Sequence, residues 1–118
     1  MKWMFMLALS FFSLSSFAAD SYLQCMQALP ASAPGFCASF KAVAACHCEE
    51  SGVPKPQCQN MNLIYQFMIA RFGSVDKACE YQRDTSKQVC MDDWSCYRTG
   101  GKDSTGYLCS STGKACSN

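Results

Sequence analysis

The sequence has few of the side chains on which most enzyme mechanisms depend, and it contains a single histidine among 118 residues. That residue, His47, is the only histidine that could serve as the general base for a nucleophilic serine or cysteine, and no Gly-x-Ser-x-Gly motif accompanies it. The chain also lacks a phosphate-binding loop, a dinucleotide-binding fingerprint and an EF-hand calcium loop. The sequence therefore indicates no catalytic residue, no metal ligand and no cofactor.

An excess of charge of one sign is absent too. Ten Lys and Arg stand against nine Asp and Glu, a formal net charge of +1, and proteins that bind nucleic acid usually carry a clear basic excess. Glu49-Glu50 and Asp92-Asp93 are adjacent carboxylate pairs, but neighbouring helical residues point about 100° apart and do not converge. We expect both pairs to lie on solvated helix surface.

The one long apolar run lies at the beginning of the chain. It follows Lys2, spans residues 3–17 and ends where Ser16 and Ala18 supply the small residues that signal peptidase recognises. This pattern predicts a cleaved signal peptide over residues 1–18, with cleavage after Ala18 or after Ala19. The run is shorter than the roughly 20 residues that span a bilayer, so we expect no transmembrane anchor and a secreted or periplasmic location.

Cysteine is abundant instead. All ten cysteines follow the predicted signal, and an even number in an exported chain of this size is typical of a disulfide framework with up to five bridges. The spacing Cys46-His47-Cys48 is too short for a zinc-binding pair, and on a helix the two sulfurs would reach different elements. Cys90 and Cys96 are six residues apart, which on a helix also makes them face different directions, so we expect them to bridge to different partners. The predicted disulfide cysteines are Cys25, Cys37, Cys46, Cys48, Cys58, Cys79, Cys90, Cys96, Cys109 and Cys116.

Proline and glycine divide residues 19–118 into short segments that favour helix. The predicted helices are residues 22–29, 37–50, 57–72, 75–82 and 86–97. Residues 101–118 have the composition of an irregular tail, which its two cysteines would hold in place. The sequence therefore predicts a single all-α domain, a small disulfide-rich bundle of four to five short helices with an irregular, disulfide-stapled C-terminal tail, and we expect a monomer.

The predicted helix at 57–72 is apolar around most of its circumference and so needs burial on more than one side. It is either a central core helix or a helix of which one face lines a pocket or contacts a partner. Met61 and Tyr65, next to the proline-rich connector where burial could be incomplete, and Met68 and Phe72 are its candidate contact residues. A second candidate contact region is the tail, with Arg98, Lys102 and Tyr107.

The Cys46-x-Cys48 spacing resembles plant lipid-transfer proteins and fungal haem-binding secreted domains. The sequence lacks the adjacent Cys-Cys pair of the first group and the haem-ligating Asp of the second, which would lie between Cys37 and Cys46. We transfer no function from either group.

The composition favours an exported, non-enzymatic interaction protein, possible classes being a bacterial secreted effector or a host-interaction factor, with an unknown protein or lipid partner. The first alternative is a small carrier of a lipid or apolar ligand, which requires an apolar cavity beside residues 61–72. The second is a small secreted hydrolase, which requires convergent carboxylates or a base near His47.

Overall fold

The computed structural model describes residues 25–117, and within that range it contains helices and no β-strand. The predicted all-α, disulfide-rich fold is confirmed, whereas the predicted signal peptide lies outside the described residues. No helix of residues 25–117 is long and apolar enough to cross a membrane. The elements are α1 (Phe36–Glu50), the 3-10 segment η2 (Lys55–Cys58), α2 (Met61–Phe72), α3 (Val75–Tyr81), α4 (Lys87–Arg98) and the 3-10 segment η3 (Cys109–Ser111).

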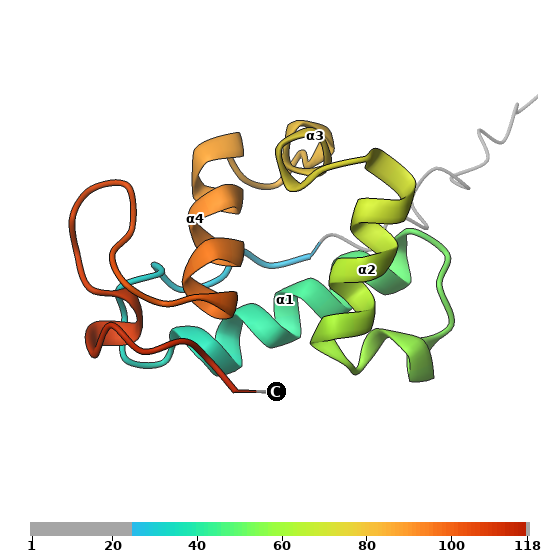
Figure 1. Ribbon diagram of the computed structural model, residues 1–118. Helices are drawn as coiled ribbons and strands as arrows, with labels where there is room; N and C mark the ends of the chain where they lie inside the picture. Colours follow the sequence, from blue (N-terminus) through green and yellow to red (C-terminus); the bar gives the residue numbers. More distant parts are fainter. Residues whose placement is uncertain (1–24, 118) are drawn as a thin grey trace, which may run out of the picture.

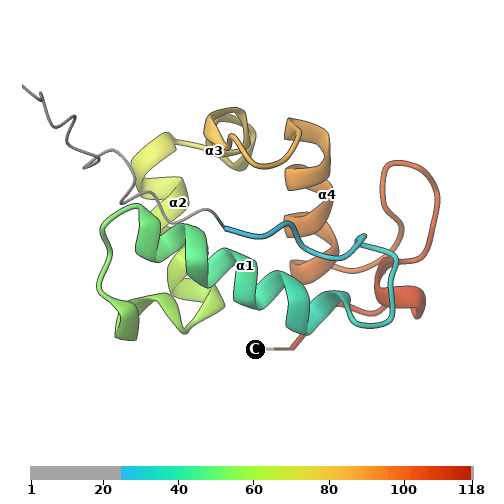
Figure 2. The same cartoon turned by 180° about the vertical axis from the view of Figure 1, so that it is seen from behind.

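The four α-helices are arranged as a frame (Figure 1). Helix α1 forms its base, α2 and α4 rise from α1 on opposite sides, and the short helix α3 joins their upper ends. Seen from behind, the extended segment that precedes α1 crosses α4 (Figure 2). The tail after α4 folds back along the outer side of the frame.

The helix boundaries follow from side-chain caps that the sequence contains. The Asn60 side chain accepts hydrogen bonds from the amides of Asn62 and Leu63, so α2 begins at Met61 and not near Gln57 as predicted. It ends as predicted at Phe72, where Gly73 has a φ of 92° and donates to the Ile69 carbonyl. Ser74 and Ser86 cap α3 and α4 in the same way.

The helix predicted over residues 22–29 is wrong for the part that the structure describes. Residues 25–29 have no regular structure, because tertiary contacts hold this segment extended. Cys25 is bridged to Cys46, the Gln27 side chain donates to the Asp84 carbonyl, and the Leu29 amide donates to Ser39 Oγ. A segment this short, followed by Pro30, has too few residues for a stable helix of its own.

All ten cysteines are paired, as predicted from their even number. Cys46 and Cys48 do bridge to different elements, and so do Cys90 and Cys96. The two tail cysteines connect to α4 and α1 rather than to each other. The bridges are Cys25–Cys46, Cys37–Cys116, Cys48–Cys58, Cys79–Cys90 and Cys96–Cys109.

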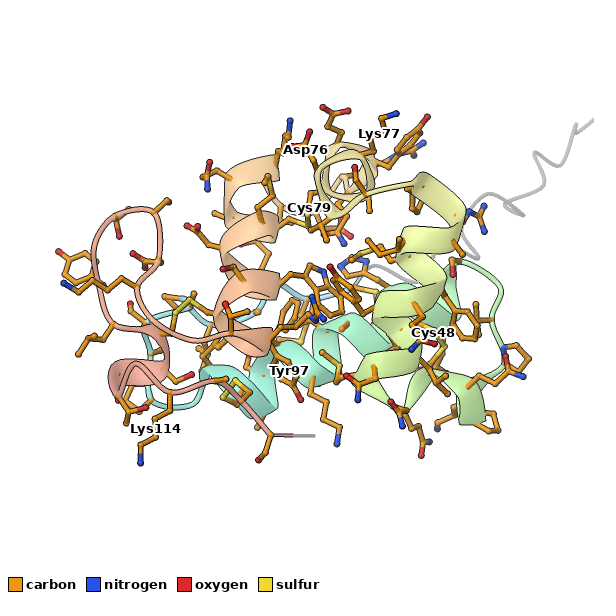
Figure 3. All side chains as sticks on the ribbon, viewed as in Figure 1. Cys48, Asp76, Lys77, Cys79, Tyr97 and Lys114 are labelled. Atoms are coloured by element: carbon orange, nitrogen blue, oxygen red, sulfur yellow. A yellow bond between two sulfur atoms is a disulfide. The ribbon has the colours of Figure 1, made fainter. Side chains whose placement is uncertain are left out.

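Half-cystines make up much of the core. Of the five largest side chains that are fully buried, one is Phe36 and the other four are Cys58, Cys79, Cys96 and Cys109. Cys79 lies where α3 meets α4, and Tyr97 lies at the base of α4 beside α1 (Figure 3).

An aromatic cluster supplies the remaining large contacts, between α1, α2 and α4. Phe40 meets Trp94 edge-on with ring centroids 4.9 Å apart, and it also contacts Phe36 and Tyr97. Such aromatic pairs add roughly 0.5–1.5 kcal/mol beyond their buried area. Phe40, Ala44 and Cys48 follow one another at four-residue steps along α1, and all three are buried on its inward face.

The tail is ordered by backbone contacts as well as by its two bridges. The Cys116 amide donates to the Tyr97 carbonyl, and the Ser110 amide donates to the Ala31 carbonyl. At Gly100 the tail passes so close that an added Cβ would lie 2.5 Å from the Ala115 nitrogen, and the φ of 70° there also favours glycine. The irregular tail therefore belongs to the domain.

The bridge between Cys37 and Cys116 should stabilise the fold more than the bridge between Cys25 and Cys46. It spans 79 residues against 21, which in the chain-entropy treatment corresponds to about 4.5 kcal/mol against about 3.3 kcal/mol. We expect the double variant Cys37→Ala/Cys116→Ala to lose more free energy of unfolding in urea than Cys25→Ala/Cys46→Ala. The reverse order would show that native packing, rather than loop length, determines the contribution of each bridge.

Candidate functional site

The frame of helices surrounds a partly open cavity of about 340 Å³. Its walls come from α1, α2 and α4, from residues 26–28 of the extended segment and from residues 82–85 between α3 and α4. Most of the lining is apolar. The apolar lining residues are Met26, Ala28, Phe40, Val43, Ala44, Val53, Ile64, Phe67, Met68, Phe72, Val89 and Trp94, together with the half-cystines Cys48 and Cys90.

The way the helices are joined explains why this space is not filled. Phe40 and Trp94, in edge-to-face contact, belong both to the lining and to the aromatic cluster. Cys48 and Cys90 each bridge along the frame, to Cys58 and Cys79, and do not project large side chains across it. A half-cystine connects two elements with little side-chain volume, so this framework can hold helices together around a space.

Helix α2 lies at the edge of the frame and not at its centre. Only Met61 and Ile64 on it are buried, while Leu63 and Phe67 keep 39% and 38% of their surface exposed. The expectation that α2 is buried on more than one side is therefore wrong for these two residues. Tyr65 of this helix contacts the aromatic cluster through Trp94, and Ile64, Phe67, Met68 and Phe72 line the cavity.

Asp93 is the acidic group placed deepest in the lining. It is only 6% exposed, and within residues 25–117 no group donates a hydrogen bond to its carboxyl. Its neighbour Asp92 faces the tail instead, where it accepts hydrogen bonds from the amide and hydroxyl of Ser104. The expectation that this pair lies on solvated surface is wrong for Asp93, because that residue shares the buried face of α4 with Cys90, Trp94 and Tyr97.

Burial changes the acidity of this group. Removal from water, and secondarily the nearby charge of Asp92, raise the pKa of Asp93 from 3.8 to about 7. A carboxylate without a hydrogen-bond donor is unfavourable in an apolar site, and the group responds by holding its proton. Near neutral pH the cavity therefore contains a carboxyl that is readily converted between its neutral and charged forms.

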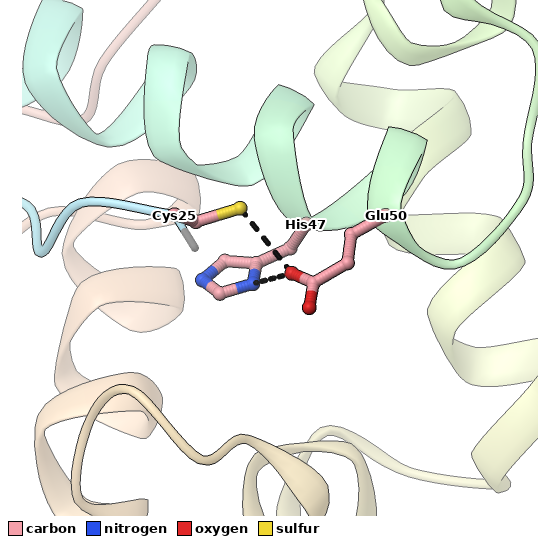
Figure 4. Close-up of side chains that lie close together, drawn as sticks. All are labelled: Cys25, His47 and Glu50. Carbon is pink, nitrogen blue, oxygen red and sulfur yellow. Dashed lines mark hydrogen bonds and ion pairs between the residues drawn. The ribbon is translucent and has the colours of Figure 1, made fainter. Parts of the chain in front are cut away.

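His47 lies at another part of the lining, on α1. Its Nδ1 is 3.6 Å from Glu50 Oε2 (Figure 4) and 4.0 Å from Asp84 Oδ2. Cys25 Sγ is 3.4 Å from the same Glu50 oxygen, but this sulfur is bonded to Cys46 and carries no hydrogen. The three side chains in Figure 4 therefore do not form a metal site, because the sulfur cannot act as a thiolate ligand.

The structure brings only part of the predicted contact set to the cavity. Met68 and Phe72 line it, whereas Met61 and Tyr65 do not. Met61 is only 2% exposed, so the expectation of incomplete burial there is wrong. Tyr65 is half-buried against Trp94, with the Arg98 guanidinium 3.6 Å above the centre of its ring. Whether any of these residues contacts a ligand stays a prediction.

The two remaining candidates lie in the tail, away from the cavity. Lys102 and Leu108 form an isolated antiparallel bridge that closes a small loop. Asp103 supports this loop, since its Oδ1 accepts hydrogen bonds from the amides of Thr105 and Tyr107. Tyr107 and Leu108 are both exposed.

Sequence reasoning missed Asp93, Val89 and the segment 82–85, although a signal for Asp93 was present. Asp93 lies three residues after Cys90 and four before Tyr97, which places a charge within an apolar helical stripe. A charged residue in such a position is a stronger indication of a site than an adjacent carboxylate pair. No comparable signal marks residues 82–85, which reach the cavity only through the turn between α3 and α4.

Comparison with known proteins gives no further indication of function. No family model, no curated protein and no solved structure matches this sequence.

The buried carboxyl makes a prediction about stability and pH. Because the pKa of Asp93 is higher in the folded chain than in the unfolded one, its contribution to the free energy of unfolding decreases as the pH rises from about 4 to about 7. We expect Asp93→Asn to melt at nearly the same temperature as the natural chain at pH 4, and several degrees above it at pH 8. Asp92→Asn is the control: it removes only the secondary cause of the shift, so it should keep most of the pH dependence of the natural chain. Parallel melting curves for Asp93→Asn and the natural chain across this range would contradict the burial argument.

Proposed function

We propose that this protein is an exported binding protein for a small apolar molecule, which it holds in the cavity between its helices. The observation that carries the proposal is the cavity itself, about 340 Å³ in volume and lined mainly by aliphatic and aromatic side chains from separate elements. Ligand sites in proteins are typically concave, largely apolar, and supplied with a small number of polar groups. The lining of this cavity is mainly apolar, and Asp93 and His47 are two of its eight polar lining residues.

The cavity volume favours a small ligand over a membrane lipid. Small-molecule sites range from about 300 to 1,000 Å³, and this cavity is at the lower end of that range. A phospholipid with two acyl chains is too large for it. A single short chain or a small ring system fits, and the Met26 and Met68 side chains at the wall can adapt their shape to either.

The disulfides support the extracellular or periplasmic part of the proposal. Five bridges are stable in an oxidising compartment, and in the reducing cytosol they would be lost. They would also keep the cavity open before ligand arrives, which reduces the entropy lost on binding. Secretion through a signal peptide at residues 1–18 is part of this proposal.

The test is to fill the cavity with a larger side chain and to measure the binding of an apolar fluorophore. Met68→Trp places an indole in the space, and we expect it to weaken binding of N-phenyl-1-naphthylamine at least tenfold with little change in melting temperature. Leu63→Trp is the matched control, because Leu63 lies on the same helix, is 39% exposed and does not line the cavity. Equal binding by Met68→Trp and the natural chain would exclude the cavity as the site.

A second candidate function is contact with a protein partner through the tail loop. Tyr107 and Leu108 are 66% and 46% exposed, beside Lys102, on a loop that the Cys96–Cys109 bridge and the Asp103 hydrogen bonds hold in place. An exposed aromatic and aliphatic pair on an ordered loop is a common composition of interface hot spots. A hydrolase finds less support, since the charged side chains close to the His47 imidazole are carboxylates and none of them is a nucleophilic serine or cysteine.

A further inference from the structure

We propose that the ligand carries a protonated amine at one end, and that this ammonium group pairs with the Asp93 carboxylate inside the cavity while the apolar remainder contacts the aromatic and aliphatic lining. This inference rests on the proposed function, because it specifies the class of molecule that the same cavity would take.

The position of Asp93 is the first step of the argument. The residue comes from the middle of α4, lines the cavity and is more than nine-tenths buried. The apolar residues Val89, Cys90 and Trp94 line the cavity from the same helix. No group within residues 25–117 donates a hydrogen bond to the carboxyl, so it can accept one from a molecule bound in the cavity.

Asp93 does not serve the fold as buried carboxylates usually do. Buried carboxylates are ordinarily paired with a cation or held by several donors, because an unpaired charge in an apolar site is costly. Asp92 and Asp103 have such donors, from Ser104 and Thr105. Asp93 lacks them, and an apolar residue of similar size would fit the same face of α4 better. A binding role accounts for the presence of this carboxyl where a packing role does not.

The other charged groups that face the cavity favour a cation over an anion. From α1 comes His47, which is already next to Glu50 and Asp84. Asp84 itself lines the cavity from the turn before α4, and Asp92 adds a negative charge beside Asp93. Arg71 of α2 is the basic lining group; it is exposed, with its guanidinium 5.8 Å from the ring centre of Phe72. The buried part of the site is therefore acidic.

Pairing with an ammonium group would also shift Asp93 to its charged carboxylate form. In the empty cavity burial raises the pKa of this carboxyl to about 7, so both the neutral and the charged form are populated near neutral pH. An ammonium at hydrogen-bond distance favours the carboxylate and lowers this pKa again. Binding at pH 7 should therefore release protons, and an uncharged ligand of the same shape should release none.

The experiment compares octylamine, octanol and octanoate by isothermal titration calorimetry with the full oxidised chain at pH 8. These probes share an apolar chain and differ in the head group, which is cationic, neutral or anionic. We expect octylamine to bind about tenfold or more tightly than octanol, since a charge-assisted hydrogen bond is stronger than a neutral one, and octanoate to bind most weakly. Titrations at pH 7 in two buffers of different ionisation enthalpy should show proton release with octylamine alone.

Two isosteric variants identify the group responsible. In Asp93→Asn the ratio of octylamine to octanol affinity should fall to about one, and the proton release should disappear. Asp92→Asn, altered at the adjacent residue that faces the tail, removes only the secondary charge, so it should keep a clear preference for octylamine and a reduced proton release. A melting curve for each variant, and binding of octanol by Asp93→Asn, show that a folded cavity is being compared.

The outcomes separate this inference from the proposed function. Octanol binding with no preference for octylamine, or a preference that persists in Asp93→Asn, would overturn the amine assignment and leave the apolar site intact. Tightest binding by octanoate would also overturn it and would place the head group near Arg71. If none of the three probes binds, both the cavity function and the inference fail.

Discussion

The fold depends on disulfide bridges whose half-cystines form a large part of a small hydrophobic core. Four of the five largest fully buried side chains are half-cystines, and the described domain is too small to bury a large apolar core. The bridges join α1 to η2, α3 to α4, and the tail to both α1 and α4. Large side chains interdigitate mainly around Phe40, where α1 and α4 meet.

This mode of stabilisation permits a cavity in so small a domain. In a bundle held by apolar packing alone, a space of about 340 Å³ removes contacts that the fold needs, and the neighbouring helices collapse into it. Here the ends of the helices are fixed covalently, at Cys48–Cys58 on one side and at Cys79–Cys90 on the other. The apolar residues of α2 can then face a space rather than a partner helix, which explains why Phe67 and Met68 are not fully buried.

The sequence sufficed to predict the four α-helices but not how they meet. Gly73 and Ser74 act locally as helix caps, so the end of α2 and the start of α3 were predictable. The complete pairing of the cysteines was predictable from their even number. The extended course of residues 25–29 was not, because it depends on Cys25 reaching Cys46 and on Gln27 reaching Asp84. The cavity was unpredictable for the same reason. Its walls come from segments far apart in the sequence, and ten cysteines allow too many pairings to place those segments side by side.

Asp93 shows how the same framework can hold a group that the fold alone would not favour. Its burial should lower the stability of the folded chain above neutral pH, since the carboxylate then lacks a donor within residues 25–117. Five bridges, each adding about 2–4 kcal/mol, leave the domain stable enough to keep such a group in place. The free energy of unfolding that the bridges contribute thus offsets the cost of burying the Asp93 carboxylate. When a cation binds in the cavity, it can donate to the Asp93 carboxylate the hydrogen bond that the empty protein does not supply.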